Sequence, residues 1–140
     1  MKRSLLIAAG ALLSLGAGLA ASAQPSAYVV KVPFAFHVGK QELPAGTYYV
    51  DSKRLGIEST ISVETIRQAG EAGIVLHTVS DLRAKNKTAA LKLVFHQYNG
   101  VYFLSQFWGV DGFGKQLAVS PQETEMAMKK APVSLTIASR

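Results

Sequence analysis

LKLVFHQYNGVYFLSQFW, residues 91–108, carries the strongest structural signal of this 140-residue chain. Two runs rich in β-branched and aromatic residues flank Asn99-Gly100, the preferred residue pair for a type I′ turn because both residues tolerate positive φ. A two-residue loop also fixes the register. We therefore predict a hairpin of residues 91–98 and 101–108, with these pairs facing each other: Tyr98–Val101, Gln97–Tyr102, His96–Phe103 and Phe95–Leu104.

That register divides the hairpin side chains between two faces. The face expected in the core carries Leu91, Leu93, Phe95, Tyr102, Leu104 and Trp108. The opposite face is also fairly apolar and carries Lys92, Val94, His96, Phe103 and Phe107. Because neither face is fully polar, we expect both to be covered, as in a small barrel or a sandwich with a flanking segment.

Further strands are predicted before and after the hairpin, at residues 28–38, 47–50, 61–64, 73–79 and 133–137. Apolar residues alternate in the first of these, and Pro33 makes it an edge strand or a strand with a bulge. Turns are predicted at residues 43–46 and 68–71, a basic loop at residues 80–87 and a flexible loop at residues 109–114. Residues 52–60 are ambiguous.

One helix is predicted near the C-terminus. Ser120 and Glu123 form a capping-box pattern, with Pro121 at the first helical position. The helix should run from Pro121 to Lys130 and end before Pro132. The fold class predicted from all these signals is all-β: a small antiparallel barrel or sandwich of about seven strands with one short C-terminal helix.

Residues 1–23 have the three regions of a secretory signal peptide. Lys2 and Arg3 precede an apolar run, and Ala21-Ser22-Ala23 matches a signal-peptidase site. The alternative is an uncleaved anchor, but the run is shorter than the ~20 residues that a spanning helix needs. We expect an exported protein, periplasmic or extracellular, with residues 24–140 as a single β-rich domain and no transmembrane segment after cleavage.

Charge and cysteine content exclude several functions. There is no cysteine, which excludes disulfides, cysteine nucleophiles and cysteine-based zinc sites. The net charge is +6, and without Lys2 and Arg3 of the predicted signal it is +4 (13 basic and 9 acidic residues). This modest positive charge suits an anionic envelope polymer or lipid head group, although solubility alone would explain it. Nucleic acid is excluded as a partner by the expected compartment.

No catalytic, cofactor or metal site is predicted. The histidines His37, His77 and His96 lie in separate predicted strands, and none is at metal-ligand spacing from another. There is no G-x-S-x-G motif, and Ser105 lies inside a strand rather than on a sharp turn. A small hydrolase is therefore the least favoured function.

Two groups of residues are candidates for surface binding. Tyr49 and Phe107 are aromatic residues whose strand parity points away from the expected core. Arg83, Lys85 and Lys87 make the predicted loop basic, and they could contact an anionic polymer.

The chain also resembles a known group of proteins through three motifs: Phe36-His37-Val38-Gly39 continuing to Leu43-Pro44-Ala45-Gly46-Thr47-Tyr48, Tyr102-Phe103-Leu104-Ser105 with Trp108, and Ser120 with Glu123. These motifs are similar to those of small uncharacterised exported proteins of soil bacteria. A more basic helix start is common in that group, where this chain has Pro121-Gln122. The resemblance implies export and a β-rich fold, and it implies no catalytic residues.

The function expected from the sequence is a non-catalytic exported β-domain that binds or supports a cell-envelope component, either a polymer or a protein. An alternative is a carrier that holds a small apolar ligand inside a β-barrel. Self-association into a homo-oligomer is a further way to cover the second apolar face of the hairpin.

Overall fold

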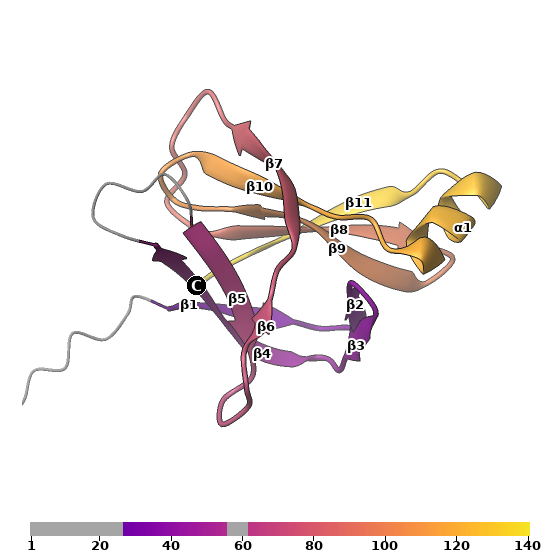
Figure 1. Cartoon of the computed structure of the whole chain (residues 1–140), viewed down its shortest axis with the longest axis horizontal. Coiled ribbons are helices and arrows are strands. Elements are labelled where there is room, and N and C mark those ends of the chain that lie inside the picture. The colour runs from indigo at the N-terminus through magenta and orange to yellow at the C-terminus, as the bar shows by residue number, and fades with distance from the viewer. Residues whose placement is uncertain (1–26, 56–61) are drawn as a thin grey trace, which may run out of the picture.

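The computed structural model describes residues 27–55 and 62–140. The predicted signal peptide and most of the ambiguous segment at residues 52–60 lie outside this part of the chain. The described residues form two sheets and one helix, so the predicted all-β class with a short C-terminal helix is confirmed (Figure 1).

The first sheet has the strand order β1-β4-β5-β6, and we call it sheet A. All its pairs are antiparallel. Its strands are β1 (Tyr28–Val32), β4 (Gly46–Arg54), β5 (Ser62–Arg67) and β6 (Ile74–Val75). The first predicted strand stops at Pro33, which cannot donate to a neighbour, and the chain resumes as β2 in the other sheet.

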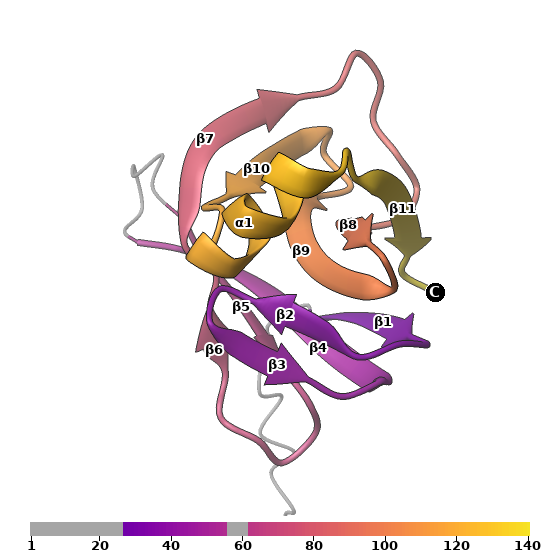
Figure 2. The ribbon, with the colours of Figure 1, turned by 90° about the vertical axis from the view of Figure 1, so that its right-hand side faces the viewer.

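The second sheet, sheet B, has the strand path β11-β8-β9-β10-β7. Its strands are β7 (Thr78–Arg83), β8 (Lys92–Tyr98), β9 (Val101–Trp108), β10 (Phe113–Leu117) and β11 (Val133–Ala138). The short strands β2 (Phe36–Val38) and β3 (Gln41–Leu43) extend it, and β2 pairs with β9 in parallel. Sheet B curls into a half-barrel around helix α1 (Pro121–Lys129) (Figure 2).

The predicted hairpin is β8 and β9, and all four predicted pairs are present. Asn99 and Gly100 both have positive φ, as a type I′ turn requires. The register then shifts beyond Phe95–Leu104, where Ser105 forms a β-bulge and Val94 pairs with Gln106. One extra residue reverses the facing of the rest of the strand. Phe107 and Trp108 therefore exchange the faces that the sequence predicts for them.

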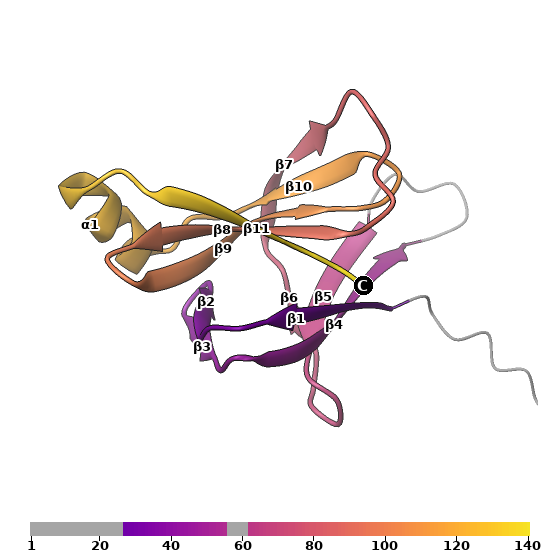
Figure 3. The ribbon, with the colours of Figure 1, turned by 180° about the vertical axis from the view of Figure 1, so that it is seen from behind.

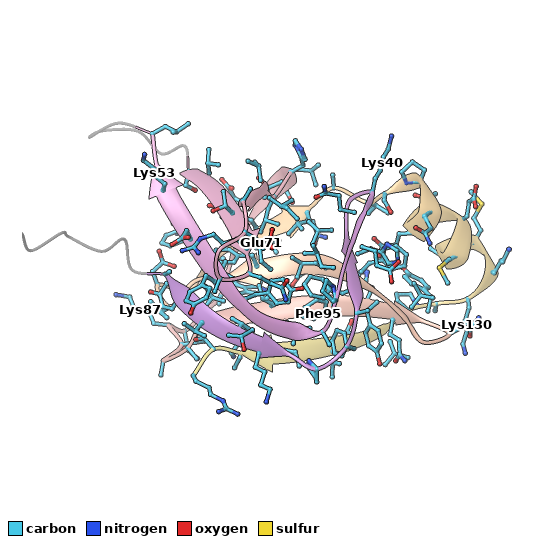
Figure 4. All side chains as sticks on the ribbon, turned by 90° about the horizontal axis from the view of Figure 1, so that it is seen from below. Lys40, Lys53, Glu71, Lys87, Phe95 and Lys130 are labelled. Carbon is cyan, nitrogen blue, oxygen red and sulfur yellow. The ribbon has the colours of Figure 1, made fainter. Side chains whose placement is uncertain are left out.

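The core fills the space between sheet A and the convex face of sheet B. Phe95 lies near the middle of this space, and both it and Phe36 are fully buried (Figure 4). Aromatic edges meet there: the ring centroids of Phe36 and Phe95 are 5.2 Å apart at 77°. The buried apolar residues of this core are Val30, Val32, Phe36, Val38, Tyr48, Val50, Ile66, Leu76, Leu91, Leu93, Phe95, Leu104, Phe107 and Leu117.

Two other predicted segments change. The strand expected at residues 73–79 is divided between β6 in sheet A and β7 in sheet B, so the chain crosses between sheets at Leu76 and His77. The loop expected at residues 80–87 is shorter, because β7 continues to Arg83. After β11 the chain returns to sheet A, where Arg140 N donates to Val29 O at 3.4 Å (Figure 3).

Candidate functional site

Helix α1 lies on the concave face of sheet B and closes one end of the half-barrel (Figure 2). It begins as predicted: the Oγ of Ser120 accepts a hydrogen bond from Glu123 N at 3.1 Å, and Pro121 follows. Glu123 is the buried residue of the helix. The helix is therefore attached to the sheet through a carboxylate, not through an apolar stripe.

The Glu123 carboxylate contacts two side chains of β8. Its Oε1 lies 3.0 Å from Nδ1 of His96 and accepts from the Tyr98 hydroxyl at 3.2 Å. Burial, together with the nearby Glu123 charge and this hydrogen bond, raises the pKa of Tyr98 above its usual value. The phenol therefore stays protonated and remains a donor to the carboxylate.

His96 continues the network towards the middle of the sheet. Its Nε2 lies 3.3 Å from the Oγ of Ser105, so serine, histidine and carboxylate follow in the order found in serine hydrolases. However, Ser105 is only 4% exposed, and the amide of Gln116 donates to its Oγ at 3.2 Å and to its carbonyl at 3.0 Å. A substrate carbonyl cannot reach this hydroxyl. The hydrogen-bonded network of Ser105, His96, Tyr98 and Glu123 instead holds α1 against sheet B.

An open pocket of about 240 Å³ lies elsewhere on the same concave face. Its lining residues come from the strands, the β9–β10 turn and the segment after β7: Ala84, Thr88, Lys92, Val94, Trp108, Gly109, Gly112 and Thr136. Lys92 and Trp108 face each other in the register of β8 and β9, so both side chains lie on one face. We call this cavity the Trp108 pocket.

The Trp108 ring lies against strand β10. It lies over Gly114 of β10, where a Cβ atom would come within 2.6 Å of Cε3 of the ring. Its Nε1 donates to Oε1 of Gln106 at 2.9 Å, and Nε2 of Gln106 donates to Oε1 of Gln116 at 3.0 Å. The hydrogen bond and the contact with Gly114 therefore fix the orientation of the indole.

The segment of residues 84–91 joins the edge strand β7 to β8, which lies next to the other edge strand, β11. The segment therefore crosses the concave face, at the end opposite α1. Ala84 N donates to the carbonyl of Gly112 at 2.8 Å. Gly112 has φ +84° and lies close to the backbone of Asn86. Lys87 belongs to this segment, and Lys130 directly follows α1. The two residues lie at opposite ends of the molecule (Figure 4).

The predicted surface residues do not form one site. Tyr49 is half-buried on the outer face of sheet A, with the Arg67 guanidinium 5.0 Å from its ring centroid. The Arg83 guanidinium lies 4.7 Å from the Phe113 centroid, on the sheet face opposite Trp108. Lys85 and Lys87 are exposed on the segment that borders the Trp108 pocket.

The assignment of Phe107 to the surface is wrong. Phe107 is 5% exposed and pairs with Leu93 in the core, because the bulge at Ser105 turns it inward. The same shift moves Trp108 from the predicted core face to the concave face, where it is half-buried. The polar Ser105 within an apolar run was the one sequence signal of this irregularity.

The three histidines have different surroundings. His37 stacks on Phe103, with ring centroids 5.0 Å apart. His77 is exposed in the link between β6 and β7, and His96 contacts Glu123 of α1. Within residues 27–55 and 62–140, no group of three side chains could hold a metal ion. In the same ranges, no helix has the length and apolarity needed to cross a membrane.

No protein-family model, no curated protein and no solved structure matches this chain. The geometry of the two arrangements on the concave face of sheet B is therefore the basis for a function.

Proposed function

We propose that this protein is a non-catalytic, exported β-domain that binds a component of the cell envelope through the Trp108 pocket. The observation that carries the proposal is the fixed Trp108 indole beside Lys92 in an open cavity. Binding sites commonly combine a preformed apolar surface with a few polar groups that orient the ligand.

The chemistry of the pocket supports binding rather than catalysis. Lys92 is the one ionisable side chain among the lining residues, so the pocket offers no acid and base pair. The serine, histidine and carboxylate array lies under α1, and its hydroxyl is buried and hydrogen-bonded. Neither arrangement provides an accessible nucleophile with an adjacent base.

The packing also favours this proposal over a carrier of an apolar ligand between the sheets. That carrier needs space between the sheets, where the buried rings of Phe36 and Phe95 pack with centroids 5.2 Å apart. A carrier would have to use the Trp108 pocket, which is open and carries a cationic side chain. An anionic, partly polar ligand fits those properties better than an apolar one.

Charge around the pocket supports an anionic partner. Lys85 and Lys87 are exposed on the segment whose Ala84 and Thr88 line the pocket, and Lys92 lies inside it. An anionic polymer of the envelope would be attracted by these three cations over the Debye length of about 10 Å at moderate salt.

The test is co-sedimentation of the protein with insoluble envelope polymers from the producing cells. We expect Trp108→Leu to lose most of the bound fraction. Phe113→Leu is the matched control, because Phe113 is an exposed aromatic on the opposite face of the same sheet. Equal binding by both variants and the wild type would refute the assignment of the pocket, and no binding by the wild type would refute the function.

A further inference from the structure

The floor of the Trp108 pocket is a preorganised flat surface. Gly114 lies against the indole, and the hydrogen bonds through Gln106 to Gln116 fix its orientation. The ring lines the pocket, so a ligand in the pocket can stack on it. Because the face of an aromatic ring is electron-rich, it attracts the polarised C–H bonds of a pyranose ring. A ring that is already fixed loses little entropy on binding.

Lys92 adds a positive charge at the edge of this floor. It faces Trp108 directly in the register and is half-buried. Among the ion pairs of the described residues, none includes Lys92. Its ammonium group provides three hydrogen-bond donors and no acceptor, so its natural partner is an anion.

The remaining lining groups limit the size and polarity of the ligand. Thr88, whose hydroxyl donates to the carbonyl of Ala90 at 2.8 Å, lines the pocket together with Thr136 and the apolar Val94. The cavity of about 240 Å³ is smaller than the roughly 300–1,000 Å³ of sites for drug-sized ligands. It therefore suits a single ring, and its opening allows that ring to be part of a longer chain.

We infer that the pocket binds one carboxylated pyranose unit of an acidic polysaccharide. The inference rests on the proposed function, and it specifies the ligand of the same site. The apolar face of the sugar stacks on Trp108, and its carboxylate pairs with Lys92. Lys85 and Lys87 are exposed on the bordering segment, and they provide cations for the carboxylates of neighbouring units.

Other ligands use only part of this arrangement. A neutral sugar stacks on Trp108 and leaves the Lys92 charge without a partner. Inorganic phosphate pairs with Lys92 and leaves the indole unused. A carboxylated pyranose uses both groups, which face each other across the β8–β9 ladder.

The experiment measures binding of galacturonic-acid oligomers and of their methyl esters by calorimetry, using protein purified from cells that express the full chain. The ester keeps the ring and removes the charge. We expect the acid oligomer to bind at least about tenfold more tightly than the ester, a difference of about 1.4 kcal/mol, because only the acid carries a charge that pairs with the Lys92 ammonium. Lys92→Gln should abolish this preference, whereas Lys40→Gln, an exposed change at the β2–β3 turn, should keep it.

Trp108→Leu should weaken acid and ester alike, because it removes the stacking surface that both use. Equal affinity of the wild type for acid and ester, a preference that survives Lys92→Gln, or saturable binding of inorganic phosphate with the same affinity as the acid oligomer would each overturn the inference. If neither oligomer binds while Trp108-dependent co-sedimentation with envelope polymers persists, the ligand class is wrong and the proposed function stands. If the wild type binds neither oligomer and does not co-sediment with envelope polymers, both the inference and the proposed function are refuted.

Discussion

Nδ1 of His96 lies 3.0 Å from Oε1 of Glu123, and this contact joins the central hairpin to the C-terminal helix. Most side chains of α1 are exposed, and Met128 is 81% exposed. A helix of nine residues is too short to be stable alone. Its position therefore depends on the buried carboxylate of Glu123 and on the Ser120 cap.

Replacement of Glu123 should detach or loosen α1. Glu123→Ala removes the acceptor of the buried Tyr98 hydroxyl and the partner of the half-buried His96 ring. We expect a loss of about 1–3 kcal/mol in the free energy of unfolding, measured by chemical denaturation. Glu125→Ala, an exposed change in the same helix, should have little effect. Equal stability of the two variants would contradict a role for Glu123 in attaching the helix.

The stability of the protein should fall at alkaline pH. Burial and the contact with Glu123 raise the pKa of Tyr98 above the ordinary value of 10.0, so the folded state favours the neutral phenol. This stabilisation is fully present below pH 10 and is lost as the pH rises through the higher folded-state pKa. Burial also raises the pKa of Tyr48, so the protein has two such tyrosines.

Ultraviolet titration of tyrosinate in the folded protein measures this effect. Tyr48 and Tyr98 should ionise above their ordinary pKa of 10.0, and Tyr98→Phe should remove one of these two late transitions. Tyr102→Phe is the control, because Tyr102 is only partly buried. Ionisation of all five tyrosines in one step near pH 10 would contradict the buried contact with Glu123.

Phe107 should behave as a core residue. Phe107→Ala leaves a cavity between the sheets beside Leu93, and we expect a loss of about 3–5 kcal/mol in the free energy of unfolding. Phe113→Ala should cost no more than about 1 kcal/mol, because that ring is 48% exposed and its main partner is the Arg83 guanidinium. Thermal or denaturant unfolding measures the free energy of unfolding of each variant. Similar losses would show that the bulge at Ser105 is absent in solution.

Local chemistry explains which parts of the fold could be predicted from the sequence. The turn at Asn99-Gly100 and the cap at Ser120 depend on residues within a few positions of each other, and both are present as expected. The bulge at Ser105 depends on Gln116 and His96, which are distant along the chain or on another strand. Alternation alone therefore assigned Phe107 and Trp108 to the wrong faces.

The Trp108 pocket could not be predicted from the sequence, because it also depends on contacts between distant segments. The curl of sheet B brings the segment after β7 across to Trp108, and no local pattern encodes that approach. The strand expected at residues 73–79 is divided because the backbone of Leu76 donates to Glu64 of sheet A, while Thr78 already pairs with Leu117 of sheet B. Lys85 and Lys87 could be named as a basic loop, but not as neighbours of a pocket.

Gly114 should control the position of Trp108. A Cβ at residue 114 would lie 2.6 Å from Cε3 of the indole and 3.0 Å from the carbonyl oxygen of Phe107, closer than side chains tolerate. Gly114→Ala must therefore lift the ring from the sheet and break its hydrogen bond to Gln106. Because Trp108 is the single tryptophan, its fluorescence reports the change directly.

We expect Gly114→Ala to shift the emission to longer wavelength, as the indole gains contact with water, and to weaken binding at the Trp108 pocket together with that shift. Gly73→Ala is the matched control: its Cβ would meet only the Thr65 side chain, at an ordinary 3.5 Å from Cβ. That variant should keep the wild-type emission and binding. If Gly114→Ala leaves the emission unchanged, the indole does not lie on Gly114, and the flat floor on which the ligand is proposed to stack does not exist.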